Sequence, residues 1–553
     1  MVPRMISTMV SYEVECRTVG NRDTVDTQEQ EDRTYFTPEK KKRHPIPQIR
    51  YARRMKEGNV QLANMSNFTL VYPSPTLAAA VDPLLNLGVG RSLDELRAET
   101  SQKIQALIDD ADLSQFIVEG GDSDRWYWAA PLLLDRANEH FKNLVSTALD
   151  YDPSKDAEFG SDDDDEPDQE GAKKDHFDFL RQCFDDPGAA KLGAIPDNLA
   201  KVLADLSLGS PAVIAYRSLQ RAFPSSVTAT RFRQAMKIAN AFVSLFNKPE
   251  SIAAVRLSEN HRWYWLMVAD YCASGCLQSV LDEYLHLLLE QSDSSPDVVK
   301  QLCDAVNLNT STINVDSLES FTMDDSRKMR CHYAVEFGSQ RLEESSGQKR
   351  AANLREVFNS PFRPFLLSTT SIGQEGLDFH SYCRRIVHWN LPSNPVDLEQ
   401  REGRINRFKS LVIRQQIAKK YRHTIAAEDL HDTTKIWDNL FAAADMEERQ
   451  KAGKCELIPY WHVSADEHPK IERVIPLYPF SVDRQRLSTI LKTLTIYRLA
   501  FGQPRQAELV EHLLNRNLSD EEIAHVKKTL MIDLSPISYH PPMNVPHHIK
   551  HEP

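Results

Sequence analysis

The 553-residue sequence has no long apolar run, no dense cysteine framework and no overall positive charge. No apolar stretch reaches 18 residues, and the N-terminus lacks the apolar core of a signal peptide, so we expect neither a membrane span nor secretion. The eight cysteines are scattered, which predicts reduced thiols and a cytoplasmic location. We expect no metal site, because Cys272 and Cys276 have no second cysteine pair to complete one.

The net charge of −13 means that no global basic field attracts nucleic acid, so any such binding must be local. One candidate is the basic strip, residues 401–422, which carries eight Lys or Arg and one acidic residue. Its members Lys419 and Lys420 would attract backbone phosphates. The alternative is a solvated helical face.

The length predicts two to four domains with sizeable cores. We expect an α/β fold class in which one parallel-sheet lobe is embedded between large, mainly helical regions. The predicted segments are a polar N-terminal stretch (1–60), a mainly helical region with an acidic loop near 150–175 (61–320), the α/β lobe (321–425) and a mainly helical region with a frayed tail (426–553).

Local signals place elements within the first helical region. Ser92 and Glu95 form a capping box that predicts a helix start, and residues 69–72 form an apolar run that predicts a short strand. The tetrapeptide Arg-Trp-Tyr-Trp occurs at 125–128 and again at 262–265. Such aromatics either stack on bases or pack in a core, and we favour the core.

Residues 282–286 read Asp-Glu-Tyr-Leu-His, a match to the D-E-x-x-H pattern that places carboxylates beside Mg²⁺ in nucleotide hydrolases. That chemistry needs a buried strand directly before the motif. The surrounding sequence, LQSVLDEYLHLLLEQ, has helical periodicity throughout, so we assign the match to chance.

The α/β lobe is predicted from alternating elements. Residues 331–337 read as a strand, 348–358 as a helix and 364–370 as the next strand, which favours a parallel sheet with right-handed crossovers. A ligand site is expected beyond the carboxyl ends of such strands. There the chain has polar Ser368, Thr369 and Thr370, followed by a loop with Gly373 and Gly376.

A second strand (386–389) is followed by a helix. Asn394 is a suitable N-cap and Pro395 suits the first helical position. The spacing places Gln400, Arg404 and Arg407 on one helical face. Two guanidinium groups there, facing the glycine loop, would meet a nucleotide triphosphate. The alternative is a surface helix with ion pairs.

Two motifs in this stretch resemble those of a known family. TTSIGQEGLDF (369–379) resembles motif V, and QREGRINR (400–407) resembles motif VI, of superfamily-2 helicases, especially the bacterial Swi/Snf-like helicases. The resemblance implies the second RecA-like lobe of a nucleic-acid-dependent ATPase, which uses ATP with Mg²⁺ and contacts nucleic acid. Analogy with the family favours DNA over RNA, and the sequence itself leaves that choice open.

The resemblance also implies residue roles. Arg404 and Arg407 would be catalytic arginine fingers that reach the γ-phosphate across the interface between lobes. Nucleotide-binding residues would be Gln400, Gly376, Gly403 and Asp378, the last near the ribose or the interlobe hinge. Nucleic-acid contacts would come from Ser368, Thr369, Thr370 and the basic strip.

The sequence departs from the complete family pattern, because it contains no phosphate loop G-x-x-x-x-G-K-[ST]. Two hypotheses follow. In the first, the chain is the second lobe of a motor and needs a first lobe, encoded upstream or supplied in trans, for hydrolysis. In the second, it is a non-catalytic nucleic-acid-binding or scaffold protein that retains the lobe fold. We favour the first, because the motif VI arginines are intact.

Overall fold

The computed structural model of the chain describes residue 49 and residues 62–86, 91–150, 167–226, 228–256, 263–292, 294–307, 311–315, 327–331, 357–362, 366–367, 378–426, 429, 431–452, 456–463, 469–476, 482–500, 505–516 and 518–530. The chain divides into two compact units. The first unit comprises Met1–Val335, Phe362–Pro364 and Ala426–Ile436, and the second comprises Glu336–Pro361, Phe365–Ile425 and Trp437–Pro553.

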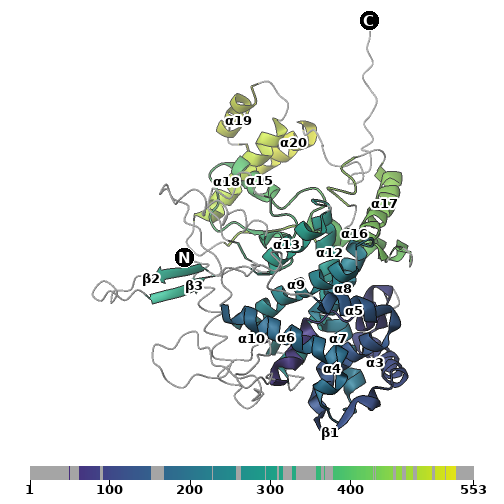
Figure 1. Ribbon diagram of the computed structural model, residues 1–553. Coiled ribbons are helices and arrows are strands. Elements are labelled where there is room, and N and C mark those ends of the chain that lie inside the picture. Colours follow the sequence, from purple (N-terminus) through teal and green to yellow (C-terminus); the bar gives the residue numbers. More distant parts are fainter. Residues whose placement is uncertain are drawn as a thin grey trace. The chain divides into compact units, whose positions relative to one another are not determined.

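The first unit is almost entirely helical in its described residues (Figure 1). Its elements are η2 (Leu62–Leu70), α2 (Pro75–Ala80), η3 (Pro83–Asn86), α3 (Leu93–Asp110), η4 (Leu113–Phe116), β1 (Ile117–Asp122), η5 (Ser123–Arg125), α4 (Trp126–Ala137), α5 (Glu139–Leu149), α6 (Pro167–Asp185), η8 (Pro187–Ala190), α7 (Leu199–Gly209), α8 (Pro211–Ala222), α9 (Thr228–Phe246), α10 (Pro249–Arg256), α11 (Tyr264–Ser274), α12 (Leu277–Leu289), α13 (Ser295–Val306), β2 (Ser311–Val315) and β3 (Arg327–Cys331).

Helix α7 forms the centre of this unit. All its residues except Lys201 are buried, and it packs against α3 and α11, while α8 packs against α9 and α12. At Gly209 the backbone of α11 approaches so closely that an added Cβ would lie 1.9 Å from the carbonyl oxygen of Ala269. A helix that is buried on nearly all sides belongs to the core of the unit.

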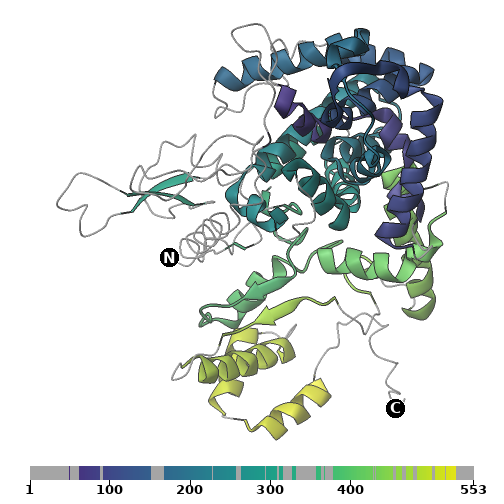
Figure 2. The same cartoon turned by 90° about the horizontal axis from the view of Figure 1, so that it is seen from below.

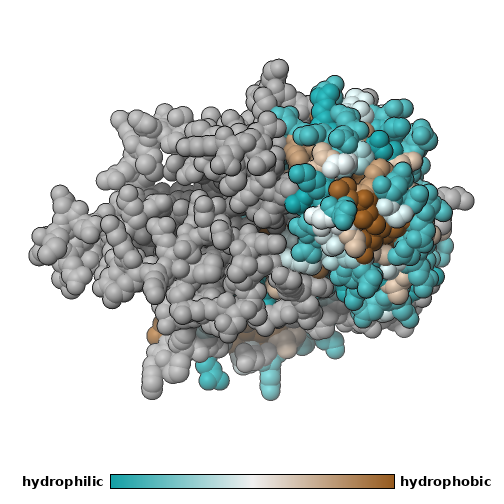
Figure 3. Space-filling model, turned by 60° about the horizontal axis from the view of Figure 1, so that its bottom comes forward, coloured by the Kyte–Doolittle hydropathy of each residue, from teal (hydrophilic) through white to brown (hydrophobic). Residues whose placement is uncertain are grey.

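The apolar residues of the helical unit lie largely inside it. The described residues in the view of Figure 3 are mostly hydrophilic and surround a small hydrophobic patch. Among the described residues no single helix is long and apolar enough to cross a membrane, although the bent pair α7 and α8 passes the same test when taken together.

Local predictions in this unit have different outcomes. Helix α3 begins at the capping box of Ser92 and Glu95, as predicted. The strand predicted at 69–72 is wrong, because η2 continues to Leu70 and the Thr69 hydroxyl donates to the Ser66 carbonyl at 2.8 Å. The apolar side chains of this run are all buried instead of alternating between two faces, so a compact turn suits them better than a strand.

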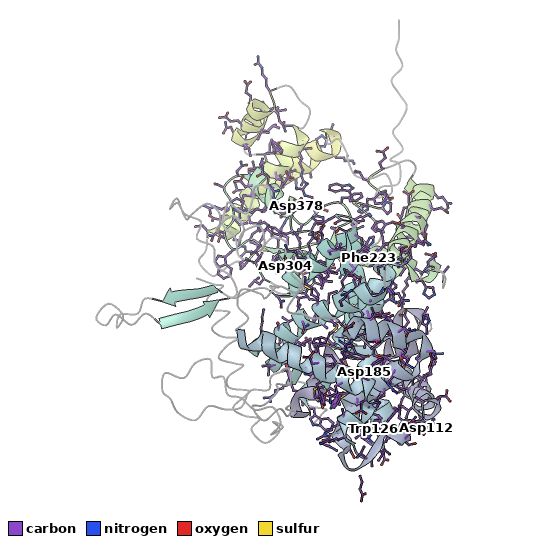
Figure 4. The ribbon with its side chains drawn as sticks, viewed as in Figure 1. Asp112, Trp126, Asp185, Phe223, Asp304 and Asp378 are labelled. Carbon is purple, nitrogen blue, oxygen red and sulfur yellow. The ribbon has the colours of Figure 1, made fainter. Side chains whose placement is uncertain are left out.

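The two Arg-Trp-Tyr-Trp copies pack against each other, which confirms the core interpretation. The ring of Tyr127 in α4 lies 5.2 Å from Trp263 and 6.2 Å from Trp265, measured between centroids. Trp126 is fully buried, and its indole N–H donates to the Gly193 carbonyl at 2.8 Å (Figure 4). These aromatics therefore hold helices together.

The D-E-x-x-H match lies within helix α12, as the periodicity predicted. The buried Asp282 carboxylate accepts a hydrogen bond from Arg221 of α8 at 2.7 Å and another from Gln278. A buried carboxylate that pairs with an arginine in this way joins two helices.

The second unit combines helices with a small parallel sheet, which confirms the predicted fold class. Its elements are β4 (Arg385–Val387), α15 (Pro395–Gly403), α16 (Leu411–Tyr421), η10 (Arg422–Thr424), α17 (Thr433–Ala452), β5 (Glu472–Val474), α18 (Asp483–Leu499), α19 (Gln506–Asn515) and α20 (Asp520–Leu530). The start of α17, residues 433–436, is assigned to the first unit. Strands β4 and β5 pair in parallel from Arg385 opposite Glu472 to Val387 opposite Val474 (Figure 2).

The strand predicted at 331–337 is described only at its first residue. Cys331 ends β3, which pairs antiparallel with β2 so that Cys331 lies opposite Ser311. This antiparallel pair includes the predicted strand only at Cys331, so the parallel crossover expected between 331–337 and 364–370 stays a prediction. Most of the helix predicted at 348–358 and the strand predicted at 364–370 lie outside the described residues.

Candidate functional site

Helix α15 begins at the capping residue that the sequence predicts. Asn394 Oδ1 accepts a hydrogen bond from the backbone N–H of Val396 at 3.0 Å, and Pro395 occupies the first helical position. The fully buried Leu398 packs in a cluster with Leu391 and Ile490 of α18. This apolar contact fixes the helix within its unit, so the predicted start is confirmed.

The predicted end of this helix is wrong. Helix α15 ends at Gly403, Arg404 is its C-cap and Arg407 lies beyond it, so Gln400, Arg404 and Arg407 do not share one helical face. The backbone N–H of Arg404 donates to the carbonyls of Arg401 and Glu402, which tightens the last turn. The chain then leaves the helix direction before Arg407.

The two arginines nevertheless converge on one carboxylate. Arg407 Nη2 lies 3.0 Å and Arg404 Nη1 lies 4.0 Å from Asp378 Oδ1. The Asp378 side chain is 36% exposed and that of Arg407 is 39% exposed. Two guanidinium groups that face one oxygen of a partly exposed carboxylate form an arrangement that can bind an oxyanion.

Hydrogen bonds to backbone carbonyls hold Asp378 beside residues 404–407, which we call the arginine turn. The Phe379 N–H donates to the Arg404 carbonyl at 2.9 Å, and the Asn359 side-chain amide donates to the Asp378 carbonyl at 2.7 Å. The convergence of the three charged side chains therefore follows from the paths of two chain segments and not from the ion pair alone.

A second charged group ties the arginine turn to the sheet. Glu402, two residues before Arg404, accepts two hydrogen bonds from the Arg473 guanidinium in β5, and its Oε1 lies 3.2 Å from His388 Nε2. His388 is buried, and its backbone N–H donates to the Val474 carbonyl at 2.9 Å. We call this group the Glu402 clamp, formed by Glu402, His388 and Arg473.

The clamp keeps Glu402 ionised. Burial alone would raise the pKa of this carboxyl, but the hydrogen bonds from His388 and Arg473 outweigh it and lower the pKa to about 2. The side-chain hydrogen bond from Glu402 in turn raises the pKa of Arg473. The end of α15 is therefore anchored by a charged pair at neutral pH.

Residues 297–409 match the family model of the helicase conserved C-terminal domain. The chain carries a helicase C-terminal domain. Comparison with curated proteins and with solved structures gave no match. The matched segment ends at Lys409, so it includes Asp378, both converging arginines and the Glu402 and His388 members of the clamp.

Two further predicted nucleotide residues of the helicase domain lie next to the convergent arginines in the sequence. Gln400 is exposed on the last turns of α15. Gly403 ends the helix, and a Cβ added there would meet no atom within 4 Å. The backbone at Gly403 therefore borders open space.

The polar loop of the helicase domain lies outside the described residues. This applies to the predicted nucleotide residue Gly376, to Gly373, and to the predicted nucleic-acid residues Ser368, Thr369 and Thr370. Their roles stay predictions.

The Lys and Arg side chains of the basic strip differ in their surroundings, since some are exposed and others pair with groups inside the second unit. Lys419 is exposed, whereas Lys420 Nζ lies 2.7 Å from the fully buried Glu448 and 3.2 Å from Glu447. Burial would lower the pKa of Lys420, but these contacts raise it. Arg414 is buried and donates to the Lys409 carbonyl at 2.8 Å. Lys420 and Arg414 therefore hold the second unit together, and Lys419 is the better candidate for phosphate contact.

Sequence reasoning missed the Glu402 clamp. Glu402 lies inside motif VI, where attention falls on the arginines, and Arg473 is 71 residues away in the sequence. No local pattern connects those two residues, so only the pairing of β4 with β5 brings them together.

Proposed function

We propose that this chain supplies the second RecA-like lobe of an ATP-dependent, superfamily-2 nucleic-acid motor. The observation that carries the proposal is the convergence of Arg404 and Arg407 on Asp378 Oδ1 within the helicase C-terminal domain. The finer assignment to bacterial Swi/Snf-like helicases, and the preference for DNA over RNA, rest on the resemblance of motifs V and VI.

The donor set fits a phosphate group. One guanidinium nitrogen of Arg407 and one of Arg404 face the same oxygen atom of Asp378, at 3.0 Å and 4.0 Å. A phosphate oxygen carries the same charge sign as this carboxylate oxygen, and arginine binds both groups. Open space at Gly403 leaves room for a ligand to approach the backbone. In this proposal ATP supplies the phosphoryl group. Arg404 and Arg407 leave the Asp378 carboxylate, bind the oxygens of the phosphoryl group and stabilise the negative charge that develops on them.

The first lobe is a required partner in this proposal. Because the sequence contains no phosphate loop, the backbone nest and lysine that hold ATP, together with the acidic residues for Mg²⁺, would come from another lobe. Ser368, Thr369, Thr370 and Lys419 would contact the nucleic-acid backbone.

The test is ATP hydrolysis by the purified chain, with and without single- and double-stranded DNA and RNA, alone and with the polypeptide encoded immediately upstream. We expect hydrolysis only in the mixture, stimulated by nucleic acid. Arg404→Ala or Arg407→Ala should lower turnover of the mixture by about 10³-fold, as for arginine fingers generally, and leave nucleic-acid binding nearly unchanged. Arg486→Ala is the matched control, because that arginine is exposed in the same unit and its guanidinium lies 4.0 Å from the carboxylate of Asp483, three residues earlier.

A second candidate function is that of a non-catalytic nucleic-acid-binding or scaffold protein. The missing phosphate loop favours it. Nucleic-acid binding without hydrolysis in every combination would select this function. Equal losses of nucleic-acid binding in both arginine variants would contradict the finger assignment.

A further inference from the structure

Directly after the arginine turn lies an aromatic cluster formed by Phe408, Tyr460 and Phe441. The Phe408 and Tyr460 rings are stacked, with centroids 5.3 Å apart and an interplanar angle of 18°. Tyr460 also stacks on Phe441 of α17, at 5.5 Å and 5°. Phe441 is buried, so the cluster has a fixed inner end on which the outer ring, Phe408, is mounted.

Lys409 brings a positive charge to this cluster. Its Nζ lies 4.9 Å from the Phe441 ring centroid and 5.6 Å from that of Phe408. Its backbone is left-handed, with φ of 49°, a conformation that residues other than glycine rarely adopt. Hydrogen bonds enforce it: the Lys409 N–H donates to the Tyr460 carbonyl at 2.9 Å, and its carbonyl accepts from the buried Arg414.

The outer ring of the cluster is accessible. Phe408 is 48% exposed although it is a large apolar side chain on a fixed stack, and Trp461, which follows Tyr460, is 40% exposed. An exposed, immobilised ring next to an ammonium group matches the two parts of a nucleotide in a strand, the flat base and the phosphate. The entropy cost of ordering the site on binding is small for Phe408, because its ring is already stacked on Tyr460, and the Lys409 backbone is already fixed by its hydrogen bonds.

We propose that Phe408 stacks on one base of a single-stranded nucleic acid while the Lys409 ammonium contacts a neighbouring phosphate. The inference deepens the proposed function, because it rests on nucleic-acid binding by this chain, but it does not depend on ATP hydrolysis. It also adds a base contact to a site for which only phosphate and backbone contacts were predicted.

The test measures binding of the full chain, without ATP, to a fluorescent thymidine oligonucleotide of about 20 nucleotides, longer than a typical single-strand site. A second oligonucleotide has the same backbone with abasic sites throughout. Phe408→Leu should weaken binding to the thymidine strand by about tenfold and leave binding to the abasic strand unchanged. Phe408→Trp should retain or strengthen thymidine binding, which keeps the test independent of any folding defect in the leucine variant.

Lys409→Gln should weaken binding to both strands and reduce the slope of log affinity against log salt by about 0.7. The control is Trp389→Leu, which removes another exposed aromatic ring (56% exposed) from the same unit and should leave both affinities unchanged.

Three outcomes would overturn the inference. The chain could bind neither strand. Phe408→Leu could lose affinity equally for both strands while Phe408→Trp also loses affinity, or Phe408→Leu and Trp389→Leu could lose affinity equally. If Phe408→Leu binds a fluorescent ATP analogue more weakly but binds the thymidine strand as the wild type does, the Phe408 ring belongs to the ATP site, and this result too would overturn the inference. Base-dependent binding in a chain whose arginine variants hydrolyse ATP normally would leave this inference standing and remove the proposed fingers.

Discussion

Among single residues, Glu402 links the arginine turn to the sheet most directly. Its carboxylate accepts from Arg473 and pairs with His388, and the same segment carries Arg404. Glu402→Gln should lower the free energy of unfolding by about 2 kcal/mol at pH 7, because a half-buried, hydrogen-bonded charge pair is lost. Urea denaturation checks this. The control is Glu399→Gln on the same helix, whose carboxylate pairs with an exposed arginine, Arg498, and should cost at most about 0.5 kcal/mol.

The lowered pKa of Glu402 also predicts how the stability of the fold depends on pH. The pKa of Glu402 is about 2 in the folded chain and about 4.3 when unfolded. A lowered pKa means that the ionised group stabilises the fold above the unfolded value, and that this contribution is lost as the pH falls towards 2. The stability difference between wild type and Glu402→Gln should therefore be constant from about pH 7 to 5.5 and shrink below about pH 4.5. A difference that grows on acidification would contradict the clamp.

Substitution of Gly403 can distinguish an effect on stability from an effect on nucleotide binding. Because an added Cβ would meet no atom within 4 Å and the residue lies at a helix end, Gly403→Ala should leave stability unchanged or raise it by about 0.5 kcal/mol. If this glycine lets a phosphate approach the backbone, the variant should still lose ATP turnover in the reconstituted motor. Thermal unfolding and turnover are measured together. Unchanged turnover would remove Gly403 from the nucleotide site.

Among elements, α15 shows how far spacing arguments reach. Its start at Asn394 followed from local capping chemistry, whereas the expected stripe through Arg407 failed because the helix ends at Gly403. Glycine near a helix C-terminus is itself a stop signal, so this end was available in the sequence. The tips of Arg404 and Arg407 are neighbours for another reason, because a turn brings both of them to Asp378, and their functional role stays a prediction.

Helices α16 and α17 supply a prediction about the basic strip. Lys420 neutralises the buried Glu448, so Lys420→Ala should destabilise the chain by about 2 kcal/mol, since a buried carboxylate loses its partner. Lys419→Ala, at the adjacent exposed position, should change stability by less than about 0.5 kcal/mol. Urea denaturation measures both. Lys419 is the position at which a charge change tests nucleic-acid binding, because a loss at Lys420 would be confounded by unfolding.

On the scale of the whole molecule, the helical unit depends on close contact between α7 and α11. Gly209→Ala should lower the free energy of unfolding by about 3 kcal/mol. The new methyl group would lie 1.9 Å from the carbonyl oxygen of Ala269, and that backbone is packed within a helix and cannot move away easily. Hydrogen exchange should accelerate in α7 and α11. Gly275→Ala is the control, since its Cβ would have a nearest neighbour at 3.2 Å, and its cost should stay below about 1 kcal/mol. Equal effects of the two substitutions would mean that the helices separate easily.

The sequence by itself determined the features that depend on nearby residues. The capping box at Ser92, the N-cap at Asn394 and the helical periodicity around Asp282 all predicted what the structure contains. Such signals act within one or two helical turns, where the backbone geometry fixes which atoms meet. The resemblance of the motif V and motif VI stretches likewise agreed with the matched helicase C-terminal domain.

Only the tertiary structure decided which distant groups meet. Asp378 reaches Arg407, Glu402 reaches Arg473, and Phe408 stacks on Tyr460, although each pair is separated by 29 to 71 residues in the sequence. Periodicity and caps carry no information about such pairs, because chain reversals and strand pairing bring them together and burial then selects the partners. The arginine pair was thus readable in the sequence, whereas its anchoring through Arg473 and the stacking of Phe408 on Tyr460 were not.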